Sequence, residues 1–279
     1  DVSGFTMQSR SLITAYKPAK VTINWLGFPA SMGFLGTEPL FDYILADSYI
    51  IPKEMESDYA EKIIRLPGCY QPNIGDRPAP ESQNKSSYGI DNNAFVFASF
   101  GQSVKITESI FKIWMKLLKQ KESSILWLLE SNAQAKTNIL EFSEKEGINP
   151  NRIKFAPKVS FQDHINRHSV VDLFLDTYPY NAHTSSSDAV WAGCPVLTLT
   201  GETFASRVAG SILKEVGCEM LITRNEDEYY QTALALSNDS AQLNNVREMV
   251  LRGKENSSLF KTPNFIKKLE NVYLGLLQK

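Results

Sequence analysis

The chain has 279 residues, of which 43% are hydrophobic and 22% are charged, and its 29 basic and 31 acidic residues leave a formal net charge of −2. This composition is typical of a globular protein and excludes a collagen-like chain or a disulfide-stapled miniprotein. The length accommodates one large domain or two modest ones. Because the charges balance, nucleic acid is not the expected partner, although the balance does not exclude a local basic pocket.

Cysteine usage and hydropathy predict a cytoplasmic protein. Cys69, Cys194 and Cys218 are far apart and form no CxxC pair, which indicates free thiols in a reducing compartment. No apolar run reaches the ~18 to 20 residues of a membrane span, and Asp1–Arg10 lacks a signal-peptide pattern. We therefore expect no membrane partner. The first residue is not Met, so we also expect the chain to be a piece of a longer protein.

The first part of the chain predicts a thin α/β lobe. Candidate strands are Val21–Trp25, Tyr43–Ala46 and Ile63–Leu66. The stretch Gln71–Asp91 then combines three prolines with Gly, Asn, Ser and charged residues, a composition typical of a linker. We predict a partial N-terminal lobe at 1–75, a linker at 76–92 and a Rossmann-like lobe at 93–279.

From residue 95 onward, short β-branched or aromatic runs alternate with helical patterns. The predicted strands are Phe95–Phe100, Ile125–Leu129, Val170–Leu175, Val196–Leu199 and Glu219–Ile222. The predicted helices are Ile106–Lys119 with Thr107 as N-cap, Ala133–Glu146, Ala205–Val216 and Pro263–Leu277. Nearly continuous apolar strands separated by helices indicate an α/β fold with a parallel sheet covered on both faces.

Several enzyme classes lose support because their motifs are absent. The sequence has no GxGxxG, P-loop, HExxH or GxSxG string, which argues against a dehydrogenase, a P-loop ATPase, a zincin and an α/β-hydrolase. It also lacks Asp-x-Asp, and its three His residues have no metal-ligand spacing. We expect no metal site.

The stretch Leu175–Asp188 predicts a phosphate site. It follows a buried strand and opens a helix with His183 and four successive hydroxyl residues, Thr184 to Ser187. Free N–H groups and the positive end of the helix dipole suit a phosphate there. The alternative is that Thr184 or a serine only caps the helix and that His183 is a partly buried loop residue.

Two further groups lie near strand ends of the same lobe. Gln102 and Lys105 follow the Phe95–Phe100 strand, and a lysine beside a helix N-terminus is unfavourable unless an anion lies between them. His164, Arg167 and His168 share one face of a short predicted helix and could meet a base or a phosphate.

Each of these groups also has an alternative without a ligand. Lys105 would then be a solvated surface lysine, the His164 face would be solvated or packed, and Asp188, a candidate for the ribose hydroxyls, would only partner the helix dipole. Because ligands bind at the carboxyl ends of strands in such folds, the groups together predict a nucleotide diphosphate pocket.

The chain resembles the C-terminal catalytic region of glycosyltransferase family 41, which comprises the O-GlcNAc transferases and the plant Spindly proteins. The strings that carry this resemblance are Trp25–Pro29, Asp42–Ile44, Phe97–Gln102 with Lys105-Ile106, Ile125–Leu129, Leu175–Thr177 and Gly201–Val208. They run in family order over essentially the whole chain. The resemblance implies a GT-B fold of two Rossmann-like lobes, of which the N-terminal one is only partly present.

The resemblance also implies roles for the candidate residues. Positions matching Gln102, Lys105, His183, Thr184 and Ser185 contact the diphosphate in the family. Those matching His164 and Arg167 approach the uracil, and that matching Asp188 binds ribose. We expect Lys105 and His183 to be catalytic, whereas no residue is indicated as the catalytic base.

By resemblance, the activity is inverting and metal-independent transfer of GlcNAc from UDP-GlcNAc to Ser or Thr hydroxyls of a protein acceptor, without a cofactor. Tetratricopeptide repeats are expected upstream, and a chain that lacks part of the N-terminal lobe is expected to be poorly active. Tyr180 stands where animal members have a small residue near the sugar, so the resemblance does not decide which sugar the donor carries.

Three alternatives remain at this point. One is a Spindly-type protein O-fucosyltransferase that uses GDP-fucose. Another is a non-catalytic nucleotide-binding module. The third is a sugar-nucleotide epimerase, which the scarcity of suitable carboxylate and His groups disfavours.

Overall fold

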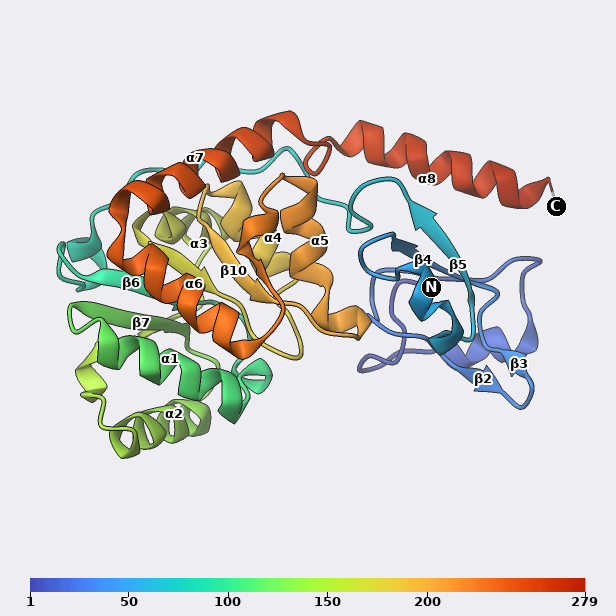
Figure 1. Cartoon of the computed structure of the whole chain (residues 1–279). Coiled ribbons are helices and arrows are strands. Elements are labelled where there is room, and N and C mark those ends of the chain that lie inside the picture. The colour runs from blue at the N-terminus through green and yellow to red at the C-terminus, as the bar shows by residue number, and fades with distance from the viewer. Residues whose placement is uncertain (279) are drawn as a thin grey trace.

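The structure is a computed structural model that describes residues 1–278 and contains two parallel sheets (Figure 1). The larger is six-stranded, in the order β11-β10-β9-β6-β7-β8, and the smaller is three-stranded, in the order β1-β4-β5. The strands are β1 (Ile23–Asn24), β2 (Phe34–Leu35), β3 (Glu38–Pro39), β4 (Tyr43–Asp47), β5 (Lys62–Leu66), β6 (Phe95–Ser99), β7 (Ser124–Leu129), β8 (Ile153–Ala156), β9 (Leu173–Leu175), β10 (Val196–Leu199) and β11 (Ile222–Thr223). The mixed α/β fold with parallel sheets is confirmed.

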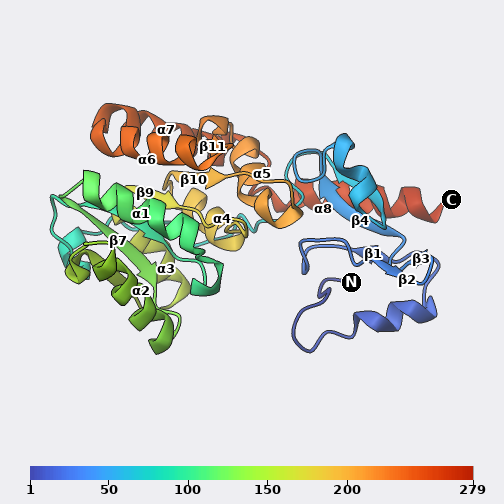
Figure 2. The same cartoon turned by 60° about the horizontal axis from the view of Figure 1, so that its bottom comes forward.

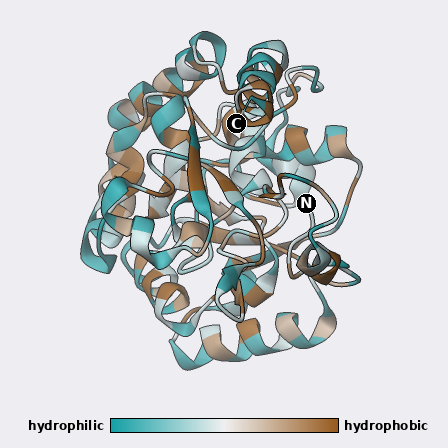
Figure 3. Ribbon diagram, turned by 90° about the vertical axis from the view of Figure 1, so that its right-hand side faces the viewer, coloured by the Kyte–Doolittle hydropathy of each residue, from teal (hydrophilic) through white to brown (hydrophobic). Residues whose placement is uncertain are grey.

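Helices cover both faces of the larger sheet (Figures 1 and 2). The α-helices are α1 (Glu108–Gln120), α2 (Ala133–Lys145), α3 (Phe161–Arg167), α4 (Thr184–Trp191), α5 (Val208–Glu215), α6 (Glu226–Asn238), α7 (Ser240–Asn256) and α8 (Thr262–Leu277). Of these, α8 extends away from the larger sheet. Figure 3 shows hydrophobic residues along the central strands and hydrophilic ones on the outer helix faces. The strands of this sheet are buried on both faces, as their continuous apolar runs predict.

The strand order indicates where a ligand would bind in the larger lobe. From β6 the chain continues outward to β7 and β8, and it then returns to the other side of β6 to form β9, β10 and β11. The order therefore reverses between β6 and β9, and the carboxyl ends of these two strands diverge into separate loops. In open parallel sheets, ligands bind in the crevice at such a reversal.

Two predicted elements are wrong, and one strand was missed. Glu219–Leu221 is a 3-10 turn, and only Ile222–Thr223 pairs with β10. The helix predicted from Ala205 begins at Val208, because Thr203 and Ser206 cap a separate 3-10 turn before it. Strand β8 was not predicted, since Ile153–Ala156 is short and its Lys154 interrupts the apolar run.

The last helix leaves the larger lobe and crosses to the smaller one (Figures 1 and 2). Phe265 of α8 stacks on Trp25, with ring centroids 5.9 Å apart, and Lys268 Nζ donates to the carbonyl of Pro67 at 2.8 Å. Within residues 1–278, no helix has the length and apolar character needed to span a bilayer.

The buried Asp47 carboxylate, where β4 ends, joins the two lobes. Its Oδ1 accepts the backbone N–H groups of Tyr49 at 2.9 Å and Ile50 at 2.8 Å. Its Oδ2 accepts the N–H of Tyr70 at 2.9 Å and, across the lobe boundary, the hydroxyl of Ser211 on α5 at 2.6 Å. Burial raises the pKa of Asp47, so these four donors offset an unfavourable desolvation.

Tyr49 makes a further contact between the lobes. Its hydroxyl donates to Thr200 Oγ1 at 3.0 Å, and its carbonyl accepts Arg207 Nε at 2.8 Å. The ring lies so close to α5 that a Cβ at Gly210 would stand 2.5 Å from the Tyr49 hydroxyl oxygen. A side chain at Gly210 would therefore displace the ring.

Asp47→Asn should lower the free energy of unfolding by about 1–3 kcal/mol, because an amide nitrogen cannot accept and leaves at least one buried donor without a partner. Denaturant unfolding at neutral pH measures the change. Asp58→Asn, the same substitution at an exposed carboxylate, should change it by less than about 0.5 kcal/mol. Equal midpoints for both variants would contradict this role of Asp47.

Candidate active site

Lys105 lies at the end of a short 3-10 turn, Ser103–Lys105, just beyond β6. Its Nζ donates to the carbonyl of Asn181 at 2.9 Å and sits 4.0 Å from the ring centroid of Tyr180, both in the loop after β9. Burial lowers the pKa of Lys105, and the negative charge of Asp176 opposes that effect. A partly desolvated cation, Lys105, therefore lies where the strand order reverses.

The loop after β9 is held by the Asp176 carboxylate, which is fully buried. Its Oδ1 accepts the N–H groups of Thr177 at 2.8 Å and Ala182 at 2.6 Å, and its Oδ2 accepts the hydroxyl of Thr198 at 2.6 Å. The Tyr229 hydroxyl also donates to the backbone carbonyl of Asp176 at 3.0 Å. Burial raises the pKa of Asp176 to about 7 despite these bonds.

His183 occupies the N-cap position of α4, so neither Thr184 nor a serine caps this helix. Its ring stacks on Tyr180, with centroids 5.0 Å apart. Burial lowers the pKa of His183 to about 3, and the Lys105 charge acts in the same direction. The imidazole is therefore neutral near pH 7, with one donor and one acceptor nitrogen.

The open end of α4 faces this group of side chains. The first amides to bond into the helix turn are those of Ser186 and Ser187, which donate to the carbonyl of His183 at 3.1 and 3.2 Å. The N–H groups of Thr184 and Ser185 precede them and belong to the orphan donors of a helix N-terminus. These donors and Lys105 suit an anion.

Unpaired polar atoms gather at the same place. Within residues 1–278, His183 Nε2, Asn181 Oδ1 and Ser186 Oγ are buried and have no hydrogen-bond partner. Because buried polar groups are nearly always paired in folded proteins, three such atoms around one helix end indicate a position that a ligand completes.

A second group lies further along α4 and on α3. His164 Nε2 stands 3.3 Å from Asp188 Oδ2, and its Nδ1 bonds Arg167. The Arg167 guanidinium lies 4.2 Å from the Phe100 ring centroid and donates to the carbonyl of Pro157 at 3.1 Å. Burial lowers the pKa of Arg167 to about 10, which still leaves it charged.

The structure sorts the predicted residues into two groups that α4 connects. Lys105, His183, Thr184 and Ser185 meet at its N-terminus, and His164, Arg167 and Asp188 meet one turn along it. Gln102 is exposed at the start of the 3-10 turn and does not cap it.

Two other residues have roles without a ligand. His168 is fully buried and packs against Phe100, which is the alternative without a ligand that the sequence allowed. Burial holds the pKa of His168 well below the usual value. The Thr107 hydroxyl does not cap α1; it donates instead to the carbonyl of Tyr178 at 2.9 Å.

Arg77 was not predicted for this site. Its Nη1 donates to Asp188 Oδ1 at 2.7 Å, and the two side chains are only 9% and 7% exposed. A single arginine among the prolines and glycines of a linker belongs to no periodic pattern, so no signal in the sequence singles it out. The linker in fact lies along the larger lobe, where Trp191 Nε1 donates to the carbonyl of Pro78 at 2.8 Å.

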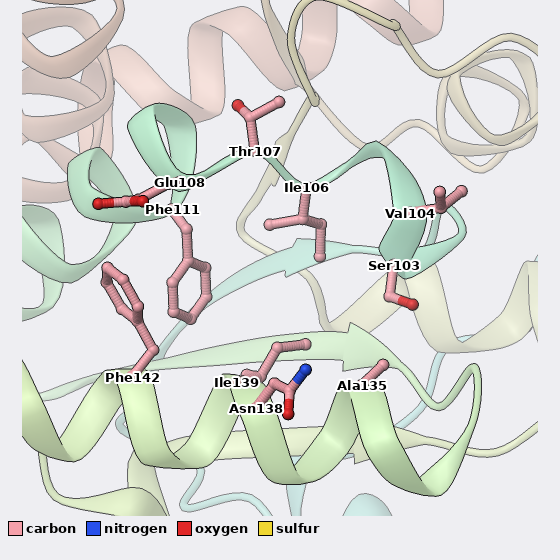
Figure 4. Close-up of a pocket in the computed structure, with 10 residues that line it drawn as sticks. All are labelled: Ser103, Val104, Ile106, Thr107, Glu108, Phe111, Ala135, Asn138, Ile139 and Phe142. Carbon is pink, nitrogen blue, oxygen red and sulfur yellow. The ribbon is translucent and has the colours of Figure 1, made fainter.

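An apolar groove of about 380 Å³ opens beside Lys105, between the start of α1 and α2. Ile106, Phe111, Ile139 and Phe142 point toward one another across it (Figure 4). None of the predicted site residues lines it. Within residues 1–278, no three His, Cys, Asp or Glu side chains are grouped so that they could hold a metal ion.

The sequence matches a known family over most of its length. The profile of the family described as Glycosyl transferase family 41 matches residues 1–79 and 81–269. The SEC protein of Arabidopsis thaliana and the SPINDLY protein of Solanum lycopersicum are both named probable UDP-N-acetylglucosamine–peptide N-acetylglucosaminyltransferases. They are 31% and 30% identical to this chain over 99% and 100% of its length. The chain spans only 29% and 30% of these relatives.

Solved structures agree with the sequence comparison. A mutant of the O-GlcNAc transferase of Thermobaculum terrenum superposes with a TM-score of 0.80 at 25% identity, covering 93% of this chain and 49% of that one. WaaG, a glycosyltransferase of lipopolysaccharide biosynthesis, superposes with a TM-score of 0.56 over 93% of this chain and 83% of its own, and at 12% identity shows the fold alone. The fold is GT-B, and the chain belongs to glycosyl transferase family 41.

Proposed function

We propose that this chain is the donor-binding part of an inverting, metal-independent glycosyltransferase that transfers GlcNAc from UDP-GlcNAc to Ser or Thr hydroxyls of a protein acceptor. One observation carries the proposal: the Lys105 cation, the free amides of α4 and the unpaired His183 Nε2 converge where the strand order reverses. The names of the relatives support the donor and the acceptor class.

In this proposal, Lys105 and α4 stabilise the leaving diphosphate. When the acceptor hydroxyl attacks the anomeric carbon, the bond to the β-phosphate oxygen breaks and negative charge builds on that phosphate. The Lys105 ammonium and the amides of Thr184 and Ser185 are already in place, so they need little reorganisation in the transition state. They supply the positive charge that other diphosphate enzymes take from a divalent cation.

The nucleoside end is assigned to the second group. His164 and Arg167 would contact the uracil, and Asp188 would accept hydrogen bonds from the ribose hydroxyls. Since α4 rises 1.5 Å per residue, the five steps from His183 to Asp188 separate the phosphate and ribose contacts by roughly 7.5 Å. One extended nucleoside diphosphate would lie along the start of this helix.

The alternative donor, GDP-fucose, rests on Tyr180. Its ring lies against both Lys105 and His183, and the side chain is 38% exposed at the site. A large aromatic group here shapes the space next to the diphosphate, where the sugar would be held. The nucleotide preference distinguishes the two donors.

Calorimetric titration of the chain with UDP, GDP and UDP-GlcNAc tests the donor class. We expect UDP and UDP-GlcNAc to bind, GDP to bind more weakly, and a chelator in the buffer to leave the affinities unchanged. A preference for GDP would move the protein to the GDP-fucose class. Failure to bind any nucleotide would refute the donor site.

Lys105→Ala should reduce kcat by about 10²–10³-fold, because it removes a charge that acts where negative charge develops. Donor affinity, measured by titration, should fall by a smaller factor, since the α4 amides remain. Lys112→Ala removes an exposed lysine of α1 and serves as the matched control. A loss of donor affinity with kcat unchanged would assign Lys105 to ground-state binding only.

Asp176→Asn should move the alkaline loss of UDP affinity to lower pH. The Asn oxygen and amide can keep the bonds to the loop and to Thr198, but they carry no charge to oppose the lowering of the Lys105 pKa by burial. Below about pH 7, where the wild-type carboxyl is itself protonated, the two proteins should bind alike.

The control for this pH experiment is Asp172→Asn, at the opposite end of β9, which should leave the pH of the alkaline loss of UDP affinity unchanged.

The raised pKa of Asp176 also has a consequence for stability. Relative to the Asn variant, the free energy of unfolding of the wild type should fall as pH rises from 3.8 through about 7. Superimposable affinity profiles for wild type and Asp176→Asn would contradict the electrostatic coupling.

A further inference from the structure

The Asp188 carboxylate is held by two basic side chains, one from the linker and one from α3. Oδ1 accepts from Arg77 Nη1 at 2.7 Å, and Oδ2 lies 3.3 Å from His164 Nε2. A carboxylate has about four acceptor positions. Two of them therefore remain for further donors, in directions that these two partners fix.

Arg77 is itself fixed by contacts on three sides. Its Nε donates to the carbonyl of Ile74 at 3.0 Å, and its Nη2 lies 3.3 Å from Asn73 Oδ1. The guanidinium carbon stands 5.2 Å from the ring centroid of Phe260, in the segment between α7 and α8. The planar fork therefore cannot rotate independently of the linker, and it transmits the linker position to Asp188.

Stability alone is a weak reason for this ion pair. Burial lowers the pKa of Arg77, which reflects the desolvation of its charge. Buried ion pairs contribute little net stability compared with apolar residues of similar size, whereas they fix the direction of the groups they join. An oriented carboxylate is useful where a ligand presents two neighbouring hydroxyls.

We propose that Arg77 is a positioning residue for nucleotide recognition and aims the Asp188 carboxylate at the ribose hydroxyls of the donor. This inference rests on the proposed function, because it takes the ligand to be a ribonucleoside diphosphate. It adds a residue of the linker to a site otherwise built from the larger sheet and its helices.

The test compares UDP with 2′-deoxy-UDP and 3′-deoxy-UDP by calorimetric titration of wild type, Arg77→Ala, Arg77→Lys and Asp188→Asn. Hydrogen bonds to a charged group imply that wild type prefers UDP over at least one deoxy analogue by about tenfold or more. Arg77→Ala and Asp188→Asn should both lose most of this preference. Arg77→Lys should retain part of it, since it restores the charge but not the fork.

The ratio of affinities separates positioning from a purely structural role. A partly unfolded variant binds all nucleotides less, but its ratio for UDP against the deoxy analogue does not change. Arg65→Ala is the matched control, because Arg65 is also a partly buried arginine, pairs with Glu56 at 2.6 Å, and lies in the smaller lobe. Its ratio should equal that of wild type.

The outcomes distinguish a failure of the positioning role of Arg77 from a failure of the proposed function. An unchanged ratio in Arg77→Ala, with UDP still bound, would overturn the role of Arg77 and leave the proposed function standing. A wild type that binds UDP without any ribose preference would overturn the role of Arg77 together with that of Asp188. A wild type that binds no nucleotide would remove the proposed function itself.

Discussion

The Asp176 carboxylate is the interaction on which the rest of the site depends. The chain leaves β9 and must reach α4 with its amides and the His183 ring facing the end of β6. Three donors hold Asp176, and one of them is the Ala182 amide, directly before His183. Together with the bond of the Asn181 N–H to the Ala205 carbonyl at 2.9 Å, this anchor fixes the path of the loop and holds the Asn181 carbonyl to which Lys105 donates.

Charge at the site is balanced so that an anion completes it. Lys105 is desolvated and carries a lowered pKa, while the neighbouring His183 is kept neutral. A second full positive charge would repel the first in a buried setting. One cation together with oriented backbone amides gives a strong local preference for negative charge at moderate desolvation, and the unpaired polar atoms around α4 are consistent with that arrangement.

The sequence was sufficient for the parts of the site that obey local rules. Lys105 stood out because a cation before a helix is unfavourable, and the structure places it against the loop after β9. Long apolar runs gave the main strands of the larger sheet. His164 and Arg167 were grouped by helical spacing, and they do bond each other.

The remaining features depend on contacts between distant segments. Arg77 and Asp188 are 111 residues apart, so no local pattern joins them. Strand β8 is short and forms one edge of the sheet, where β-propensity gives a weak signal. Thr107 had the residue type and backbone of an N-cap, but the nearby Tyr178 carbonyl took its hydroxyl instead. In each case a tertiary partner, absent from the local sequence, decided the outcome.

The two buried carboxylates at the ends of β4 and on α4 link nucleotide recognition to the arrangement of the lobes. Asp47 ties the smaller sheet to α5, and Arg77 ties the linker and the α7–α8 connection to Asp188. Both bonds join segments that are far apart in the sequence, since Asp47 and Ser211 are 164 residues apart and Arg77 and Asp188 are 111 residues apart. A ligand that engages Asp188 would therefore meet a carboxylate whose partner, Arg77, lies in the segment that connects the two sheets.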